Sequence, residues 1–301
     1  MHQESISLIQ FQKKFSTEEA CREHLYKLRW PSGYKCPRCN HEEYYFHRNR
    51  HLYHCKSCNY QVSLTAGTIF HKTRVSLLKW FWMIYLMGHQ KSGISMMSLQ
   101  SMLEIKSYKT VWLMGHKIRH AMAHRDAYYK LAGLVEMDDT YIGSKKSGKQ
   151  GRGAYGKAKV IVAVENKESK AGFAKMERVD NLGKNMISNS FDEHLESDVI
   201  LRTDGWRPYR VLKTDQRKHE AVVVGSGKNA AKMLPWVHTM ISNMKNNLRG
   251  TYHGVDIKHI SRYLSEFCYR FNRRSWQKQM FDRLLTACLN SYTITYSELS
   301  A

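Results

Sequence analysis

Residues 133–141, Gly133-Leu134-Val135-Glu136-Met137-Asp138-Asp139-Thr140-Tyr141, decide the fold. Upstream, from residue 76 to about 130, apolar residues recur at helical spacing, whereas this stretch has the short apolar run of a strand. Two adjacent carboxylates, Asp138 and Asp139, stand near the end of that strand rather than on a helix surface. The stretch therefore predicts the start of an α/β domain with acidic residues at a strand end.

The chain that follows alternates strands with helices. Further strands are predicted at residues 159–164, 173–179, 198–203 and 220–224. Helices are predicted at residues 183–195, 235–249, 256–273 and 275–290. The order β-β-β-α-β-α-β-α predicts a mixed sheet flanked by helices, with the first three strands as an antiparallel meander and the later ones joined by helical crossovers.

A further acidic residue, Asp204, directly follows the strand 198–203 and precedes Gly205. A meander and a crossover could bring Asp204 beside the first acidic pair, and adjacent carboxylates repel unless a cation neutralises them. Because strand side chains alternate, only one of Asp138 and Asp139 can face Asp204. Such oxygen ligands bind Mg²⁺, and two such ions can drive phosphoryl transfer. The alternatives are an Asx turn for Asp204 and a helix or turn cap for Asp138.

The helix at 235–249 carries the candidate third ligand. Its residues at the spacing of one helical face are His238, Ser242, Lys245 and Arg249. A neutral imidazole at His238 can ligate a metal, and Lys245 could hold a phosphate or the attacking group. Asn243 is the competing ligand, but it lies on another face of a regular helix. The alternative role for His238 is packing at the helix end behind Pro235 and Trp236.

Four cysteines lie in two pairs, Cys36-Pro-Arg-Cys39 and Cys55-Lys-Ser-Cys58. This spacing predicts a closed structural zinc site of four thiolates, since the chain's odd total of seven cysteines fits a disulfide framework poorly. A redox dithiol is the alternative, but one pair would suffice for it. The other cysteines stand in apolar helical contexts and are predicted to be buried free thiols: Cys21, Cys268 and Cys288.

Two helices at 94–103 and 110–122, joined by a tight connection, fit a helix-turn-helix. The second carries Lys117 and Arg119 as candidate DNA contacts, with an ordinary packing unit that has a solvated basic face as the alternative. A basic loop after the first strand of the α/β domain is predicted to contact backbone phosphates through Lys145, Lys146, Lys149, Arg152 and Lys157.

Composition narrows the class of protein. The chain has 301 residues with 48 Lys and Arg against 26 Asp and Glu, a formal charge of +22. Its 42% hydrophobic and 12% aromatic content excludes a disordered basic tail. We find no membrane-spanning run and no signal peptide, so we expect no membrane partner and an intracellular protein. The polyanionic partner to expect is nucleic acid.

Several blocks, taken together, resemble insertion-sequence transposases of the ISXO-like group, which have an N-terminal zinc ribbon and a ribonuclease-H-like DDE-type catalytic domain. The resemblance covers roughly residues 20–275. Its blocks are the two cysteine pairs followed by residues 66–70 (AGTIF), residues 136–143 (EMDDTYIG), residues 202–205 (RTDG), residues 250–253 (GTYH), residues 262–264 (RYL) and residues 270–274 (RFNRR).

The resemblance implies roles for individual residues. Asp138 matches the family's first catalytic Asp, Asp204 the second, and Lys245 the Lys that precedes the Gly-Thr-Tyr-His block. The third ligand is Glu or Asn in many relatives and falls here on or near His238. Zn²⁺ would be structural, and Mg²⁺ or Mn²⁺ catalytic. The implied domains are an N-terminal helix plus zinc ribbon at 1–72, a helix-turn-helix-like DNA-binding region at 73–132 and the ribonuclease-H-like domain at 133–301.

The leading hypothesis is a DNA transposase that binds terminal inverted repeats, cuts strands and joins the freed 3′-hydroxyl to a target. Its partner would be double-stranded DNA, at the element ends and at the target, and joining two ends predicts a homo-oligomer on DNA. The alternative from another class is a non-catalytic, decayed or domesticated zinc-ribbon regulator. A structure-directed nuclease without strand transfer would use the same metal site.

Overall fold

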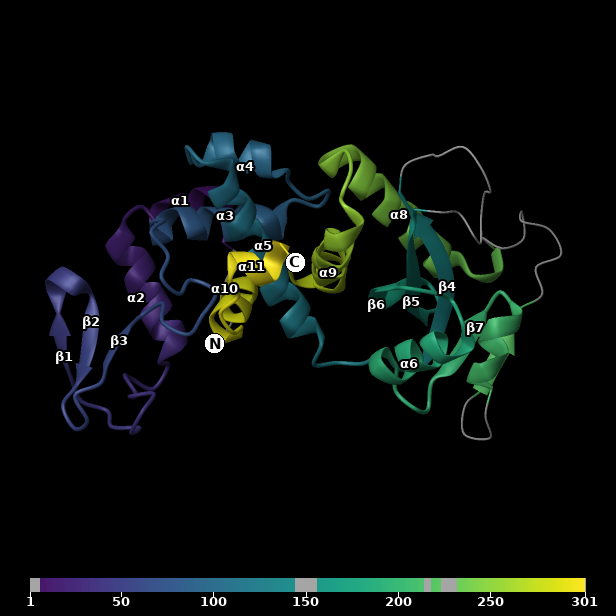
Figure 1. Ribbon diagram of the computed structural model, residues 1–301, viewed down its shortest axis with the longest axis horizontal. Coiled ribbons are helices and arrows are strands. Elements are labelled where there is room, and N and C mark those ends of the chain that lie inside the picture. Colours follow the sequence, from purple (N-terminus) through teal and green to yellow (C-terminus); the bar gives the residue numbers. More distant parts are fainter. Residues whose placement is uncertain (1–5, 144–155, 214–217, 223–231, 301) are drawn as a thin grey trace. The chain divides into compact units, whose positions relative to one another are not determined.

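The computed structural model describes residues 6–143, 156–213, 218–222 and 232–300. The chain divides into two compact units, and each is described by itself. The first comprises residues 1–90, 96–125 and 276–301, and the second comprises residues 91–95 and 126–275. The element labels below are those of Figure 1.

The first unit contains a small three-stranded sheet and a group of helices. In chain order its elements are α1 (Leu8–Lys14), α2 (Glu18–Arg29), β1 (Tyr44–His47), η1 (Arg48–Arg50), β2 (Leu52–Cys55), β3 (Gln61–Ser63), α3 (Leu77–His89), α4 (Met96–Met102), α5 (Tyr108–Asp126), η4 (Arg274–Gln279), α10 (Met280–Asn290) and α11 (Tyr296–Ser300). The strands pair antiparallel in the order β1-β2-β3, which is the predicted hairpin with its third strand.

Aromatic side chains form the core of the helical part of this unit. Phe281 of α10 is 2% exposed, and its ring lies 5.0 Å from Phe11 of α1 and 5.4 Å from Phe81 of α3. The carboxylate of Glu18 in α2 accepts hydrogen bonds from the backbone N–H groups of Leu77 and Leu78, at 3.0 and 3.1 Å. These are two of the N–H groups that the start of a helix leaves without an internal partner. Helices α1, α2, α3 and α10 are therefore joined by one buried cluster and one helix cap.

The second unit is built on a five-stranded mixed sheet with the order β6-β5-β4-β7-β8 (Figure 1). Its elements are β4 (Leu134–Ile142), β5 (Ala158–Lys167), β6 (Lys170–Val179), α6 (Lys184–His194), β7 (Ile200–Thr203), η2 (Arg207–Leu212), β8 (Lys218–Ala221), α8 (Pro235–Tyr252), η3 (Ile257–His259) and α9 (Ile260–Asn272). Strands β4, β5 and β6 pair antiparallel, whereas β7 pairs parallel with both β4 and β8. The predicted meander and the later parallel strands are both present.

Each face of this sheet has its own core because side chains alternate along a strand. Val135 and Met137 of β4 pack with Phe191 of α6 on one face. Val160 and Val162 of β5 pack with residues of α8 and α9 on the other. Strand β4 is central in the sheet, so its side chains are covered on both faces.

The observed division of the chain into two units differs from the three predicted domains. Residues 276–301 belong to the first unit rather than to the sheet, because α10 packs against α3. Short helices α1 and α11 were not predicted. The predicted strand at 220–224 is observed as β8, from Lys218 to Ala221, and residues 223 and 224 lie outside the described residues.

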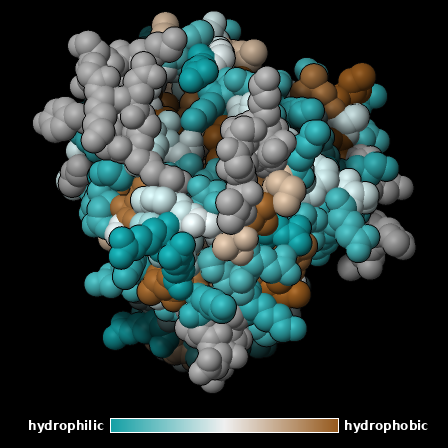
Figure 2. All heavy atoms as spheres, turned by 90° about the vertical axis from the view of Figure 1, so that its right-hand side faces the viewer, coloured by the Kyte–Doolittle hydropathy of each residue, from teal (hydrophilic) through white to brown (hydrophobic). Residues whose placement is uncertain are grey.

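On the face drawn in Figure 2, hydrophilic side chains predominate and hydrophobic ones lie in small separate groups. Among the described residues, no helix is both long and apolar enough to cross a bilayer.

Replacing Phe281 with Ala should destabilise the first unit by about 3–5 kcal/mol, because it leaves a cavity among the surrounding rings. The free energy of unfolding from urea titration measures the loss. Ile9→Ala is the matched control, since Ile9 is 66% exposed in α1 and its truncation should have little effect. Equal losses in both variants would contradict the assignment of this core.

Candidate functional site

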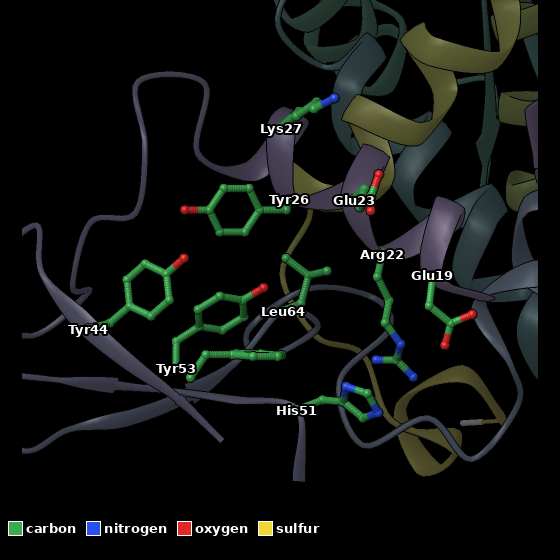
Figure 3. Close-up of a pocket in the computed structure, with 10 residues that line it drawn as sticks. Glu19, Arg22, Glu23, Tyr26, Lys27, Tyr44, His51, Tyr53 and Leu64 are labelled. Atoms are coloured by element: carbon green, nitrogen blue, oxygen red, sulfur yellow. The ribbon is translucent and has the colours of Figure 1, made fainter. Parts of the chain in front are cut away.

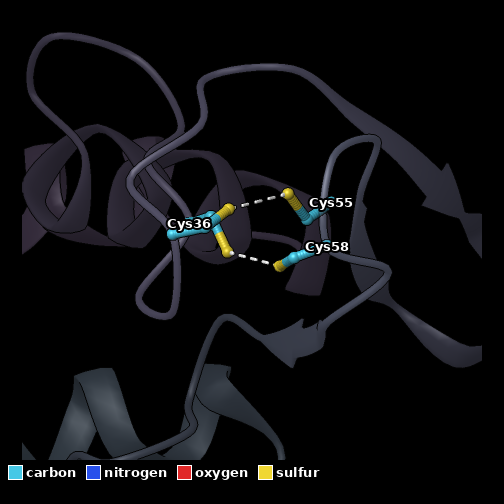
Figure 4. Close-up of side chains that lie close together, drawn as sticks. Cys36, Cys55 and Cys58 are labelled. Carbon is cyan, nitrogen blue, oxygen red and sulfur yellow. Dashed lines mark hydrogen bonds between the residues drawn. The ribbon is translucent and has the colours of Figure 1, made fainter.

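Four cysteine sulfurs of the first unit converge, as Figure 4 shows. The Sγ atoms of Cys36 and Cys58 lie 3.6 Å apart, as do those of Cys39 and Cys55, and all four lie within 4.8 Å of one another. A zinc ion 2.3 Å from each sulfur of a tetrahedron sets neighbouring sulfurs about 3.8 Å apart. Neither the distances nor the thiolate donor set conflicts with zinc, so the cluster fits a structural zinc ion with no open coordination position.

Two similar turns present these cysteines. Each Cys-x-x-Cys pair is followed by an Asn in the left-handed region, Asn40 with φ 61° and Asn59 with φ 58°. Asn tolerates this conformation better than most residues. The backbone N–H of each Asn donates to the backbone oxygen of the first cysteine of its pair, at 2.9 and 3.2 Å. Although burial raises the pKa of Cys36, hydrogen bonds from backbone N–H groups lower it to about 6, which favours the thiolate that a metal needs.

A cavity of about 430 Å³ lies between α2 and the ribbon (Figure 3). Tyr26 of α2 faces Tyr44 and Tyr53 of the ribbon, and burial raises the pKa of Tyr26 to about 12. The charged side chains of α2 in its lining balance one another: Glu19, Glu23, Arg22 and Lys27. This aromatic, nearly neutral lining suits a phosphate group poorly.

In the second unit, sheet register brings two of the predicted acidic residues together. Strand β4 pairs parallel with β7 so that Glu136 lies opposite Arg202. Two residues further along, the same register sets Asp138 beside Asp204, which directly follows β7. Asp138 is only 8% exposed. An Asp204 oxygen accepts a hydrogen bond from the backbone N–H of Trp206 at 3.0 Å, so the Asx turn considered from the sequence is also present.

Helix α8 brings His238 to the same place. His238 Nδ1 lies 3.7 Å from Asp138 Oδ2, and within the described part of the chain its buried Nε2 has no hydrogen-bond partner. Burial lowers the pKa of His238, against the charges of Glu136 and Asp204, which raise it. The imidazole is therefore held neutral, the form that can bind a metal. Asn243, the competing candidate, is exposed on α8.

The two adjacent acids of β4 point to opposite faces, as strand alternation predicts. Asp138 faces α8, whereas Asp139 accepts a hydrogen bond from the Tyr209 hydroxyl at 3.4 Å in the core that contains α6. Asp138, Asp204 and His238 do not close into a group with all ligand atoms within 4.8 Å, as the cysteines do.

Basic side chains also lie near these acids. Burial lowers the pKa of half-buried Lys245, and so do the positive charges of Arg249 and Lys157, whereas the charge of Asp138 raises it. Lys245, Arg249 and Lys157 are therefore close enough to act on one another electrostatically beside Asp138. A polyanion would relieve their mutual repulsion.

One buried residue of the site was missed by the sequence analysis. Glu136 is 0% exposed, and its Oε2 accepts hydrogen bonds from the backbone N–H groups of Trp236 and Val237, at 2.8 and 2.9 Å. Its Oε1 accepts from Asn166 Nδ2 at 2.7 Å. The signals in the sequence are its position two residues before Asp138, which gives it the same face, and a helix that begins with Pro.

The Gly-Thr-Tyr-His block holds the other end of α8. Thr251 donates to the backbone oxygen of Ser92 at 2.6 Å, and Asn247 donates to the same oxygen. The Tyr252 hydroxyl donates to Glu266 of α9 at 2.8 Å. These residues therefore stabilise the helix rather than take part in the acidic cluster.

The predicted DNA contacts have mixed outcomes. Lys145, Lys146, Lys149 and Arg152 lie outside the described residues, whereas Lys157 is described and lies beside Lys245. Lys117 is half-buried in α5 and donates to the backbone oxygen of Ile69 at 3.1 Å. Arg119 is 0% exposed, which corrects its prediction as a DNA contact: its position on α5 faces the packed interior.

A second group with metal-ligand atoms within 4.8 Å comprises Glu177, Glu193 and His194. Glu177 pairs with Ile161, so it lies on the α6 face of the sheet, opposite Asp138. The ion pair between His194 Nε2 and Glu177 at 3.3 Å accounts for their approach.

Comparison with known proteins assigns the chain to a family. Residues 16–61 match a family described as the transposase zinc-ribbon domain, and residues 130–272 match the ISXO2-like transposase domain. The chain therefore carries a transposase zinc-ribbon domain followed by an ISXO2-like transposase domain.

Among individual proteins, one described as an uncharacterized protein in transposable element ISH50 of Halobacterium salinarum is 27% identical over 233 residues. The match covers 72% of this chain and 77% of the relative. No solved structure matches the chain.

Cys39→Ser should remove the metal and unfold the ribbon, because small metal-bound modules draw much of their folding energy from the ion. Elemental analysis should find about one zinc per chain in the wild type and far less in the variant. Cys21→Ser, at a buried thiol outside the cluster, should keep its zinc. A ribbon that stays folded without metal in Cys39→Ser would contradict the assignment.

Proposed function

We propose that this protein is an insertion-sequence transposase that binds the terminal inverted repeats of its element and catalyses metal-dependent strand cleavage and strand transfer. The observation that carries the proposal is the meeting of Asp138, Asp204 and His238 in the domain that matches the ISXO2-like transposases. The strand order β6-β5-β4-β7-β8, with an antiparallel meander and parallel strands beyond it, agrees with a ribonuclease-H-like fold.

Asp138, Asp204 and His238 would hold Mg²⁺ or Mn²⁺. Carboxylates suit both ions, and His238 offers the Nδ1 atom of a neutral imidazole, 3.7 Å from Asp138 Oδ2. When bound, the ion would activate water or a 3′-hydroxyl and neutralise charge on the phosphate. The donor set fits such an ion, with the remaining positions left to water and DNA oxygens.

Lys245 would contact a phosphate oxygen of the DNA. It lies beside Asp138 with Lys157 and Arg249, so a phosphate reaching the acids meets a cluster of positive charge. Burial favours binding here, because charge interactions strengthen as water is excluded. The zinc ribbon and the helices α4 and α5 would bind the element ends, and two ends would require a homo-oligomer on double-stranded DNA in the prokaryotic cytoplasm, associated with the nucleoid.

A strand-transfer assay separates this proposal from its alternatives. The probe is labelled DNA that carries the inverted repeats flanking the gene, with Mn²⁺ or Mg²⁺ and a plasmid target. Joined products support the transposase. Nicked ends without joining indicate a nuclease, and binding without cleavage indicates a non-catalytic regulator.

Asp138→Asn should abolish cleavage and leave binding to element ends intact, because the phosphate contacts lie on other residues. Asp139→Asn is the matched control: it changes the same chemistry on the opposite face and should retain measurable cleavage. Gel-shift and cleavage assays on one DNA end give both quantities. Equal loss of cleavage at the two positions would rule out the assignment of Asp138 as the ligand that faces Asp204.

His238→Ala should lose most of the cleavage activity, whereas Asn243→Ala should keep it, since only His238 lies against Asp138. His238→Glu should recover part of the loss by supplying an oxygen ligand of similar reach. Single-turnover cleavage rates at saturating protein measure these effects without the contribution of DNA affinity. Loss in Asn243→Ala with retention in His238→Ala would reverse the assignment of the third ligand.

A further inference from the structure

Helix α8, which carries His238, begins without a side-chain cap from its own N-terminal residue. Its N-cap residue, Leu234, makes no side-chain cap, and its first helical residue, Pro235, has no N–H. The next two backbone N–H groups, of Trp236 and Val237, donate to Glu136, which lies about one hundred residues earlier in the chain. The cap of α8 is therefore supplied by the central strand of the sheet.

This cap and the acidic cluster share one strand and one helix turn. Glu136 and Asp138 are two residues apart on β4 and lie on the same face, and His238 follows directly after the capped Val237. The cap thus fixes the first turn of α8 against the strand that carries Asp138. The two residues that this connection joins, His238 and Asp138, have their Nδ1 and Oδ2 atoms 3.7 Å apart.

We infer that Glu136 is a positioning residue, whose carboxylate locks the first turn of α8 so that His238 stands over Asp138 in the geometry that binds a metal ion. The inference rests on the proposed function. Glu136 itself is not a metal ligand in this proposal, because its two oxygens accept hydrogen bonds from Trp236, Val237 and Asn166. A buried carboxylate is well placed here because it meets the positive end of a helix.

The chemistry of the three hydrogen bonds makes the residue hard to replace. Both Glu136 oxygens accept, one from the helix and one from Asn166. A glutamine at this position has one accepting oxygen, so its NH₂ group must face either the helix N–H groups or the NH₂ of Asn166. Asn166 cannot turn over freely, since its own oxygen accepts from the backbone N–H of Glu168 at 2.8 Å.

The same hydrogen-bond pattern indicates a second substitution that should restore what Glu136→Gln loses. In Glu136→Gln combined with Asn166→Asp, the glutamine oxygen can face α8 while its NH₂ donates to the new carboxylate. Asn166→Asp alone would place two carboxylates against each other and should be harmful. Recovery in the double variant would therefore report the hydrogen-bond pattern rather than general damage to the core.

Glu165 provides a matched control. It is also a buried carboxylate, 6% exposed, and it accepts from the backbone N–H groups of Ala132 and Phe173 at 3.2 and 3.0 Å. It pairs with Val135, and neither of its backbone partners belongs to α8. Glu165→Gln therefore changes a buried carboxylate to an amide on the same sheet without touching the cap of α8, although it also removes the ion pair with Lys167 at 3.4 Å.

The experiment uses the full-length, zinc-loaded chain and four variants: Glu136→Gln, Asn166→Asp, their combination and Glu165→Gln. It measures Mn²⁺ affinity without DNA, the single-turnover cleavage rate, affinity for element ends, and hydrogen exchange of the first turn of α8. Glu136→Gln should lower Mn²⁺ affinity and cleavage by about 10- to 100-fold, the usual effect of removing a group that orients a ligand, with DNA affinity unchanged. The double variant should recover most of this loss, and Glu165→Gln should retain wild-type Mn²⁺ affinity.

Three results would overturn the inference: wild-type Mn²⁺ affinity in Glu136→Gln, an equal loss in Glu165→Gln, or no recovery in the double variant. A wild-type chain that neither cleaves DNA nor binds Mn²⁺ would instead defeat the proposed function. In that case the hydrogen exchange of the Trp236 and Val237 amides still tests whether Glu136 anchors the first turn of α8. Faster exchange in Glu136→Gln, but not in Glu165→Gln, supports this anchor. Unchanged protection of the two amides in Glu136→Gln overturns it.

Discussion

The second unit depends on how its central strand accommodates three carboxylates. Strand β4 is covered on both faces, and an unpaired buried charge there would cost several kcal/mol. Glu136 is satisfied by the first turn of α8, Asp138 lies against His238, and Asp139 accepts from Tyr209. Glu136 and Asp138 thus contact α8, and Asp139 contacts η2. The positions of α8 and η2 relative to the sheet follow from these pairings as much as from apolar packing.

Helix α8 is consequently held at both ends by polar contacts and along its length by apolar ones. Glu136 binds its first turn, and Ser92 and Glu266 receive hydrogen bonds from its last turns. Between them, Met240 and Met244 pack against the sheet. A helix fixed in this way presents His238 and Lys245 in a constant position toward Asp138, which is what a reaction at a phosphate requires.

Much of the architecture could be predicted because it follows from local patterns. Short apolar runs separated by turns indicated β4 to β7, and alternation placed Asp138 and Asp139 on opposite faces. Prediction from the sequence was poorer where packing between residues far apart in the chain decides which side chains are buried. The basic residue Arg119 was expected at a DNA surface, yet its face of α5 is buried. The C-terminal helix α10 was assigned to the sheet domain but packs on α3, through contacts that no short stretch of sequence reveals.

The sequence by itself determined the two cysteine pairs and the succession of strands and helices along the chain, because these depend on residue spacing over a few positions. It placed Asp204 at the end of its strand, whereas Asp138, expected near a strand end, lies in the middle of β4. Only the tertiary structure decided that the β4–β7 register aligns Asp138 with Asp204, that His238 lies against Asp138, and that Glu136 caps α8. Those arrangements join residues far apart in the chain, such as Glu136 and Trp236 at 100 positions, or depend on which face of a helix packs inward. The free energy that selects them comes from burial and from satisfying buried charges, and these are properties of the folded chain as a whole.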